Sequence, residues 1–310
     1  MEKNNISSAR VILWCAPRCT SNLFAKCVTA IPGNEVWIEP FQYSQFAHNE
    51  MKRMGLIESD GPLPYSYEDN EDLFEKAAGG IAQFLGSEIK PQRLPYAAVK
   101  SSLEHSTSKQ VFVKDFGLAV NSEVLRQYLP VGYKHTFLIR HPYLAYRSYR
   151  KALCAQMVAI GRLSGEDDEN CDLALMGAAP GALVEDYFLK NHEMWKYVRE
   201  NIDPNPVVVD SSDLLQNPAR IMSKYCDAVG LPYSDSLLTW EATADSYHTW
   251  KLAGDNIMDN AENFVGTLMK TTGFMPPSEI PSRDELTSDV IKASDASMAC
   301  YEEMYAARIT

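Results

Sequence analysis

Five short hydrophobic runs along the chain end abruptly in polar residues. They are Val11–Cys15, Glu35–Ile38, Val111–Lys114, Thr136–Arg140 and Val207–Asp210. Apolar residues fill most of each run instead of alternating with polar ones. This pattern is typical of strands that are buried on both faces of a parallel sheet.

Helical patterns lie between these runs. They cover Ser21–Ala30, Asn121–Tyr128, Pro142–Ile160 and Leu183–Asn201. Strands that alternate with helices predict an α/β fold, with a parallel central sheet flanked by helices and right-handed crossovers. In such sheets ligands bind at the carboxyl ends of the strands. We therefore expect the functional residues where the hydrophobic runs stop.

Two stretches, residues 48–70 and 161–182, are rich in Gly, Pro, Asp and Glu. This composition predicts exposed loops or pieces of a lid. At 310 residues the chain is long enough for one large core, and we expect a single α/β domain over residues 1–310. Within it, residues 245–310 form an irregular C-terminal segment.

The net charge of -12 and the pI near 5.0 argue against nucleic acid or an anionic membrane surface as a partner. The sequence has no 18-residue apolar run, and its first ten residues have no hydrophobic signal core. These features predict a cytoplasmic protein. The seven cysteines form no CxxC pair, and in that compartment we expect them to be reduced and mostly buried.

Residues 16–22, Ala-Pro-Arg-Cys-Thr-Ser-Asn, follow the first predicted strand and lead into a helix. Backbone N–H groups and the helix dipole favour an anion at such a junction, and Thr20, Ser21 and Asn22 add donors. The kinase signature GxxxxGK[ST] is missing, so Arg18 would supply the cation. An ordinary helix cap would also favour these short polar residues.

A second segment, Phe137-Leu-Ile-Arg-His-Pro, continues into a basic helical stretch. Arg140 stands at the end of a predicted strand, and Ser148 lies eight positions later, on nearly the same helical face. Both could bind one phosphate. The alternative is a surface helix with solvated charges.

Together the two segments resemble the sulfotransferase superfamily. Pro17-Arg18-Cys19-Thr20-Ser21-Asn22 is similar to the family's PRSxST-type loop, and Arg140 with Ser148 is similar to its 3′-phosphate pair. Residues 207–233 look like its late strand, turn and helix. The resemblance implies a P-loop NTPase-like α/β fold with helical or loop lid pieces.

The same resemblance implies 3′-phosphoadenosine 5′-phosphosulfate (PAPS) as co-substrate. The loop residues 17–22 would bind its 5′-phosphosulfate, and Arg140 and Ser148 its 3′-phosphate. Cys19 stands where the family usually has serine, and a thiol is a weak donor. The family's C-terminal RKG loop is missing. Lys270 and Gly273, in Lys-Thr-Thr-Gly, are the residues left to cover the nucleotide.

The resemblance also implies in-line transfer, with Arg18 stabilising developing charge. The histidine base of the cytosolic enzymes is absent, since Lys114-Asp115-Phe116 stands in its place. Two carboxylates at strand ends, Glu39 and Asp115, are the candidate bases, and some family members use a glutamate placed as Glu39 is. A solvated strand end for Glu39, and an ion pair or helix cap for Asp115, remain the alternatives.

We therefore predict a sulfotransferase that moves a sulfuryl group from PAPS to a hydroxyl or amine of a small-molecule acceptor. No metal is expected, because the Mg²⁺-binding residues of P-loop NTPases are missing. A non-catalytic nucleotide-binding relative and a P-loop kinase or NTPase are the alternatives.

Overall fold

A computed structural model describes residues 8–58, 61–120, 122–165, 170–176, 184–242, 245–255, 257–260, 266 and 269–310. At its centre, five parallel strands form a sheet in the order β2-β3-β1-β4-β5. The strands are β1 (Ala9–Cys15), β2 (Asn34–Ile38), β3 (Gln110–Phe116), β4 (Lys134–Ile139) and β5 (Val208–Asp210). All five strands predicted from the hydrophobic runs are confirmed, as is the α/β fold class.

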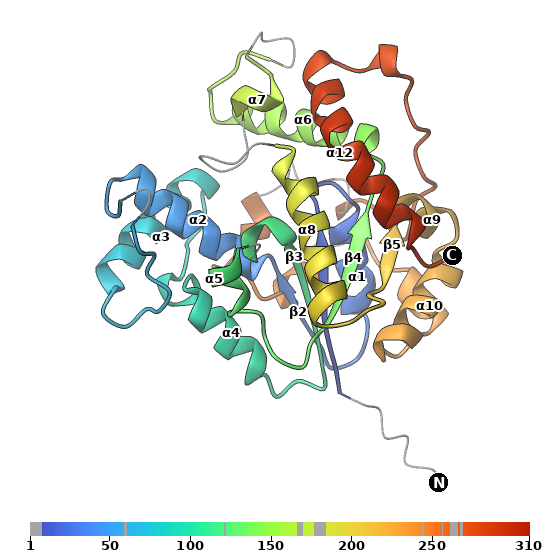
Figure 1. Cartoon of the computed structure of the whole chain (residues 1–310), viewed down its shortest axis with the longest axis horizontal. Coiled ribbons are helices and arrows are strands. Elements are labelled where there is room, and N and C mark those ends of the chain that lie inside the picture. The colour runs from blue at the N-terminus through green and yellow to red at the C-terminus, as the bar shows by residue number, and fades with distance from the viewer. Residues whose placement is uncertain are drawn as a thin grey trace.

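Helices flank this sheet (Figure 1). The longer ones are α1 (Ser21–Thr29), α2 (Pro40–Arg53), α3 (Glu71–Leu85), α4 (Tyr96–Glu104), α6 (Pro142–Ala159), α8 (Asp186–Asn201), α10 (Pro218–Val229) and α12 (Ser288–Ala306). The short ones are α5 (Glu123–Arg126), α7 (Leu173–Met176) and α9 (Ser211–Gln216). The 3-10 segments are η1 (Pro91–Arg93), η2 (Gly117–Val120), η3 (Asp235–Leu238), η4 (Asp245–Thr249), η5 (Ile257–Asn260) and η6 (Arg283–Glu285).

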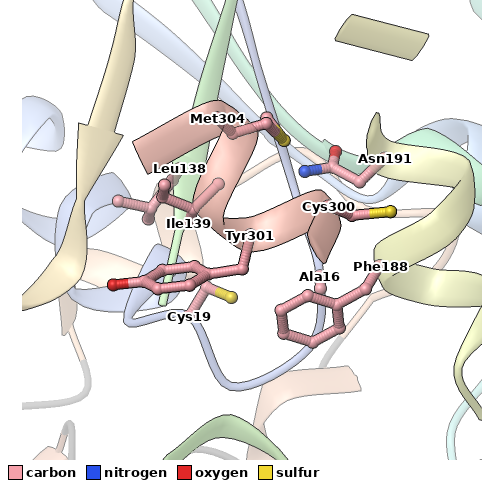
Figure 2. Close-up of a pocket in the computed structure, with 9 residues that line it drawn as sticks. All are labelled: Ala16, Cys19, Leu138, Ile139, Phe188, Asn191, Cys300, Tyr301 and Met304. Carbon is pink, nitrogen blue, oxygen red and sulfur yellow. The ribbon is translucent and has the colours of Figure 1, made fainter. Parts of the chain in front are cut away.

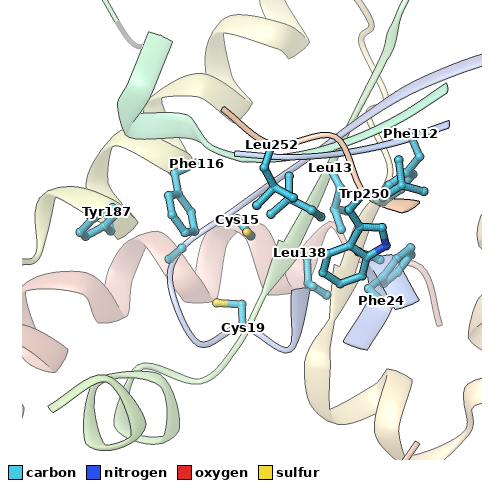
Figure 3. Close-up of a cluster of buried hydrophobic side chains, with 14 of the residues drawn as sticks. Leu13, Cys15, Cys19, Phe24, Phe112, Phe116, Leu138, Tyr187, Trp250 and Leu252 are labelled. Carbon is cyan, nitrogen blue, oxygen red and sulfur yellow. The ribbon is translucent and has the colours of Figure 1, made fainter. Parts of the chain in front are cut away.

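The central strand β1 is buried on both faces, which explains its continuous hydrophobic run. Leu13 and Cys15 belong to one cluster with Phe24 of α1, part of which Figure 3 shows. Ile12 and Trp14 point to the opposite face and belong to a second cluster that includes residues of α4, α8 and α12. Because successive side chains of a strand alternate between faces, a strand covered on both sides needs apolar residues at every position.

Polar side chains start the helices that follow β4 and β5. The carboxylate of Asp210 accepts hydrogen bonds from the backbone N–H groups of Ser212 (2.8 Å) and Asp213 (3.2 Å). The Nδ1 of His141 accepts from the N–H of Tyr143 (3.3 Å), with Pro142 at the first helical position. Such caps satisfy the first N–H groups of a helix. Both strands therefore turn into helices at the carboxyl edge of the sheet.

Both outer strands of the sheet are covered by residues from the last third of the chain. At β2, the N–H of Ile38 donates to the carbonyl of Lys251 (3.0 Å), whose own N–H donates to Val36 (2.8 Å). At β5, the N–H of Ile309 donates to the carbonyl of Val208 (2.9 Å). The backbone groups of the two edge strands thus have partners beyond the sheet.

The structure corrects two expectations. The region 48–70, predicted to be a loop, begins inside a helix, because α2 continues to Arg53 with Ala47 and Met51 buried on its inner face. The expectation that all cysteines are reduced is wrong for one pair, since Cys154 of α6 and Cys171 form a disulfide. In the described part of 161–182, the structure adds α7. No helix among the described residues is long and apolar enough to cross a membrane.

Candidate active site

The loop between β1 and α1 turns without glycine. Arg18 (φ 63°) and Thr20 (φ 70°) both have left-handed backbone conformations. Such conformations are uncommon for residues with a Cβ atom and cost free energy, so they persist only where surrounding contacts hold them. The loop is therefore a strained turn at the carboxyl end of the central strand.

Arg18 brings the two sequence motifs together. Its Nε donates a hydrogen bond to the Oγ of Ser148 on α6 (3.1 Å). The Nη1 of Arg140, just after β4, donates to the carbonyl oxygen of Arg18 (2.8 Å). Residues more than 120 positions apart in the sequence thus form one hydrogen-bonded group. Arg140 and Ser148 both lie beside the loop, but Arg140 precedes α6, so the two residues do not share one helical face as their spacing suggested.

The two guanidinium groups of this cluster, those of Arg18 and Arg140, belong to half-buried residues. Burial lowers the pKa of Arg18, and the positive charge of Arg140 lowers it further. Burial likewise lowers the pKa of Arg140. Two cations held close together in a poorly solvated place are favoured by an anion between them. Phosphate and sulfate groups are anions of this kind.

The short polar residues of the loop differ in their surroundings. The hydroxyl of Thr20 is hydrogen-bonded to the hydroxyl of Ser211, the first residue of α9 (2.6 Å), and does not cap α1. Ser21 is buried. The Oδ1 of Asn22 is buried and has no hydrogen-bond partner among the described residues. A buried polar atom without a partner is costly. Because the Thr20 hydroxyl is bonded to Ser211 and not to the first turn of α1, helix capping by Thr20 does not explain why short polar residues gather at positions 20–22.

Cys19 points away from this polar side of the loop. Its side chain is fully buried and lines a small internal cavity of about 10 Å³ between β4, α8 and α12, which Figure 2 shows together with Asn191 and Tyr301. Burial raises the pKa of the Cys19 thiol well above its ordinary value. The thiol is therefore a core side chain.

Glu39 lies at the carboxyl end of β2, the second strand from the loop. Its backbone is left-handed (φ 56°), and its N–H donates to the carbonyl of Lys114 on β3 (2.7 Å). The Glu39 carboxylate forms an ion pair with the Nζ of Lys114. The side chain of Lys114 is only 2% exposed, whereas that of Glu39 is 22% exposed. Glu39 is thus an oriented carboxylate that solvent still reaches.

Asp115 is fully buried next to this pair. Its carboxylate accepts hydrogen bonds from the backbone N–H groups of Phe41 (2.7 Å) and Phe116 (2.8 Å). Burial raises the pKa of Asp115 to about 8, and the negative charge of Glu39 acts in the same direction. Asp115 therefore binds the first turn of α2, which is the helix-cap alternative considered from the sequence. The ion pair with Lys114 is made by Glu39 instead.

The two C-terminal candidates lie in a segment paired with residues after η3. Gly273 forms a β-bridge with Thr239, and the N–H of Trp240 donates to the carbonyl of Thr272 (3.1 Å). Lys270 is exposed. The described contacts of this segment are with Thr239 and Trp240, so they do not bring Lys270 or Gly273 to the phosphate loop.

One part of the chain, which begins just before β5, matches a known protein family. Residues 203–307 match a family model described as a sulfotransferase domain. Over these residues, which are about a third of the chain, the protein is similar to the sulfotransferase family. No curated protein matches the chain.

Two solved structures are similar to this chain. One is the sulfotransferase domain from the Synechococcus PCC 7002 olefin synthase, with 15% identity and a TM-score of 0.45. That match covers 95% of this chain and 96% of the other. The second is the sulfotransferase domain from the curacin biosynthetic pathway, with 13% identity and a TM-score of 0.44. It covers 95% of this chain and 99% of the other.

Sequence reasoning missed one polar residue of this candidate site. Ser211 contacts Thr20 across 191 positions of sequence. Its place immediately after a hydrophobic run, at the edge where ligands bind in α/β sheets, was the signal that could have found it. The described residues hold no group of three or more His, Cys, Asp or Glu side chains suited to a metal ion.

Proposed function

We propose that this protein is a sulfotransferase that transfers the sulfuryl group of PAPS to a hydroxyl or amine of a small-molecule acceptor. The observation that carries the proposal is the group formed by Arg18, Arg140 and Ser148. It joins the loop after β1 to the helix after β4. An isolated capping motif would not need a second cation from another strand.

The loop and α6 supply donors for the two ends of the nucleotide. The 5′-phosphosulfate lies against Arg18, the backbone N–H groups of residues 19–22 and the side-chain donors of this loop. The 3′-phosphate lies against Arg140 and Ser148. A guanidinium has five N–H donors, and the bond from Arg140 to the Arg18 carbonyl uses one of them. The remaining donors of Arg140 suit a phosphate.

Glu39 acts as the general base in this proposal. It takes the proton from the acceptor hydroxyl or amine while that atom forms a bond to sulfur. The bond between sulfur and the phosphate oxygen breaks, and 3′-phosphoadenosine 5′-phosphate (PAP) leaves with the electron pair. Arg18 stabilises the charge that develops on the leaving phosphate.

The surroundings of the two carboxylates support Glu39 over Asp115. Solvent reaches Glu39, and an acceptor can approach from the same side. Asp115 is fully buried, and its raised pKa favours the protonated form near neutral pH. A protonated carboxyl group cannot take up the acceptor's proton.

Calorimetry with PAP and with ATP tests the donor class. Binding of PAP at least tenfold tighter than ATP is the expected result, and tighter binding of ATP would favour a P-loop kinase. Turnover of PAPS with a panel of alcohols, phenols and amines then separates an enzyme from a non-catalytic relative. Binding of PAP without sulfation of any acceptor would favour the non-catalytic relative.

A further inference from the structure

A pocket of about 300 Å³ lies outside the loop site, between the middle of α6 and the residues that lead into α12. Arg147, Arg150 and Lys151 contribute to its wall from α6, and Leu286 and Val290 from the opposite side. This volume is in the range of small-molecule sites. The proposed transfer reaction does not use these residues.

The basic side chains of the pocket divide into two kinds. Arg150 already has partners, since its Nε donates to the Asp289 carboxylate (3.1 Å) and its Nη2 to the carbonyl of Cys171. Arg147 and Lys151 are exposed, and neither has an ion pair or hydrogen-bond partner among the described residues. Residues four apart in a helix lie on the same face, so both cations reach one point in the pocket mouth.

The charge of the pocket opposes the charge of the chain. The chain has a net charge of -12, yet after Arg150 pairs with Asp289 two cations remain here against one acid, Glu285. An anion is therefore attracted to this place while most of the surface repels it. The alternative is an ordinary solvated helix face. Such a face would also expose cations to solvent, but it would not form the wall of a pocket.

The other walls of the pocket are apolar. Leu286 and Val290 lie on one side, and Cys154, whose sulfur is in the disulfide with Cys171, lies on the other. The disulfide and the Arg150 contacts connect α6, Cys171 and the start of α12. The disulfide therefore holds one wall of the pocket in place. The apolar walls suit the apolar part of a ligand whose charged group binds the two cations.

We propose that this pocket binds a phosphate or sulfate ester, with the anionic group between Arg147 and Lys151 and the apolar part against Leu286 and Val290. The site is separate from the Arg18 loop. Ser148 faces that loop, and Arg147 is rotated from it by about 100° around α6. This inference rests on the proposed function, which assigns both phosphate groups of the nucleotide to the loop and to Arg140 with Ser148, so the ester in this pocket belongs to the acceptor.

The test uses phenyl phosphate as the probe, in calorimetric titrations of the full chain at 150 mM salt. Methyl phosphate, which carries the same anionic group but lacks the phenyl ring, is the comparison ligand. Phenyl phosphate should bind more tightly than methyl phosphate. The R147Q/K151Q variant should weaken phenyl phosphate at least about tenfold, as expected when charged hydrogen bonds are lost. Lys76→Gln, which removes an exposed cation of α3, is the matched control and should leave binding unchanged.

Saturating PAP tests whether the pocket is separate from the nucleotide site. Phenyl phosphate binding that persists in the presence of PAP supports the proposal. Displacement of phenyl phosphate by PAP, together with weaker PAP binding in R147Q/K151Q, would overturn it. Failure of PAP to bind at all, with phenyl phosphate binding intact, would contradict the proposed function but support this pocket. The proposal is overturned if R147Q/K151Q binds phenyl phosphate like the unchanged chain, or if Arg140→Gln alone abolishes that binding.

Discussion

Lys114 and Glu39 are joined twice, by an ion pair between their side chains and by a hydrogen bond between their backbones. They come from the neighbouring strands β3 and β2. Burial lowers the pKa of Lys114, but the Glu39 carboxylate outweighs it, so the pKa of the ammonium lies above its ordinary value. The pair fixes the direction of the one carboxylate of the site that solvent reaches.

Glu39→Gln should reduce kcat by about 10²–10⁴, the range for loss of a general base, because an amide cannot accept the acceptor's proton. PAP affinity should change little, since the carboxylate faces the acceptor. Steady-state kinetics and calorimetry measure the two quantities. Asp115→Asn is the control, since it resembles the protonated side chain and should retain activity. Loss of turnover in Asp115→Asn, with Glu39→Gln active, would assign the base to Asp115.

Removing one member of the Glu39–Lys114 pair should destabilise the fold more than removing the other. Glu39→Gln leaves a buried ammonium without its carboxylate and should destabilise the fold by about 3 kcal/mol. Lys114→Met removes the buried charge and leaves a carboxylate that solvent reaches, so its cost should be smaller. The double variant should recover part of the loss. Urea denaturation of the four proteins measures these differences, and a larger loss for Lys114→Met than for Glu39→Gln would contradict this account.

Arg140→Ala should weaken PAP by about 1.5–3 kcal/mol, the range for a hydrogen bond to a charged group. It should barely affect adenosine 5′-phosphosulfate, which lacks the 3′-phosphate. Calorimetry with both ligands provides the comparison. Equal losses for the two would show that Arg140 does not bind the 3′-phosphate.

Transfer should proceed without a divalent metal, because a sulfuryl group carries less charge than a γ-phosphoryl group and needs less neutralisation. Turnover of PAPS should be the same in EDTA and in Mg²⁺. Activity that EDTA abolishes and Mg²⁺ restores would instead favour the kinase alternative.

Stability should fall in mild acid because two buried histidines resist protonation. Burial lowers the pKa of His48 and of His135 from 6.5 to about 4. The unfolded chain takes up these protons first, so the stabilisation is complete above pH 6.5 and disappears as the pH falls towards 4. Each histidine contributes a loss of the order of 3 kcal/mol.

His135→Gln tests this histidine effect, since the amide can still accept from the Trp14 indole N–H, which donates to His135 Nδ1 (2.9 Å). The variant should show a shallower loss of stability between pH 6.5 and 4 in urea denaturation. His105→Gln, at an exposed position, should keep the original slope. If the stability of His135→Gln falls with pH as steeply as that of the unchanged chain, His135 does not cause the loss of stability in acid.

The strands and the loop positions could be predicted because their causes are local. A strand buried on both faces must be apolar throughout, and Arg18 and Arg140 stand where such runs stop. The left-handed backbones of Arg18 and Glu39 could not be predicted, since contacts from other strands hold them. The disulfide of Cys154 and Cys171 likewise depends on how the chain after α6 returns to that helix.

The partners of the two sheet edges have a consequence for folding in the cell. Lys251 covers β2, and Ile309 covers β5. Both follow β5 in the sequence, so a ribosome makes the five strands before it makes the residues that cover their edges, and the nascent sheet has open edges until then. Open edges invite pairing with other chains, and partly made chains are most exposed to it. Chains truncated before Lys251 should therefore collect in inclusion bodies.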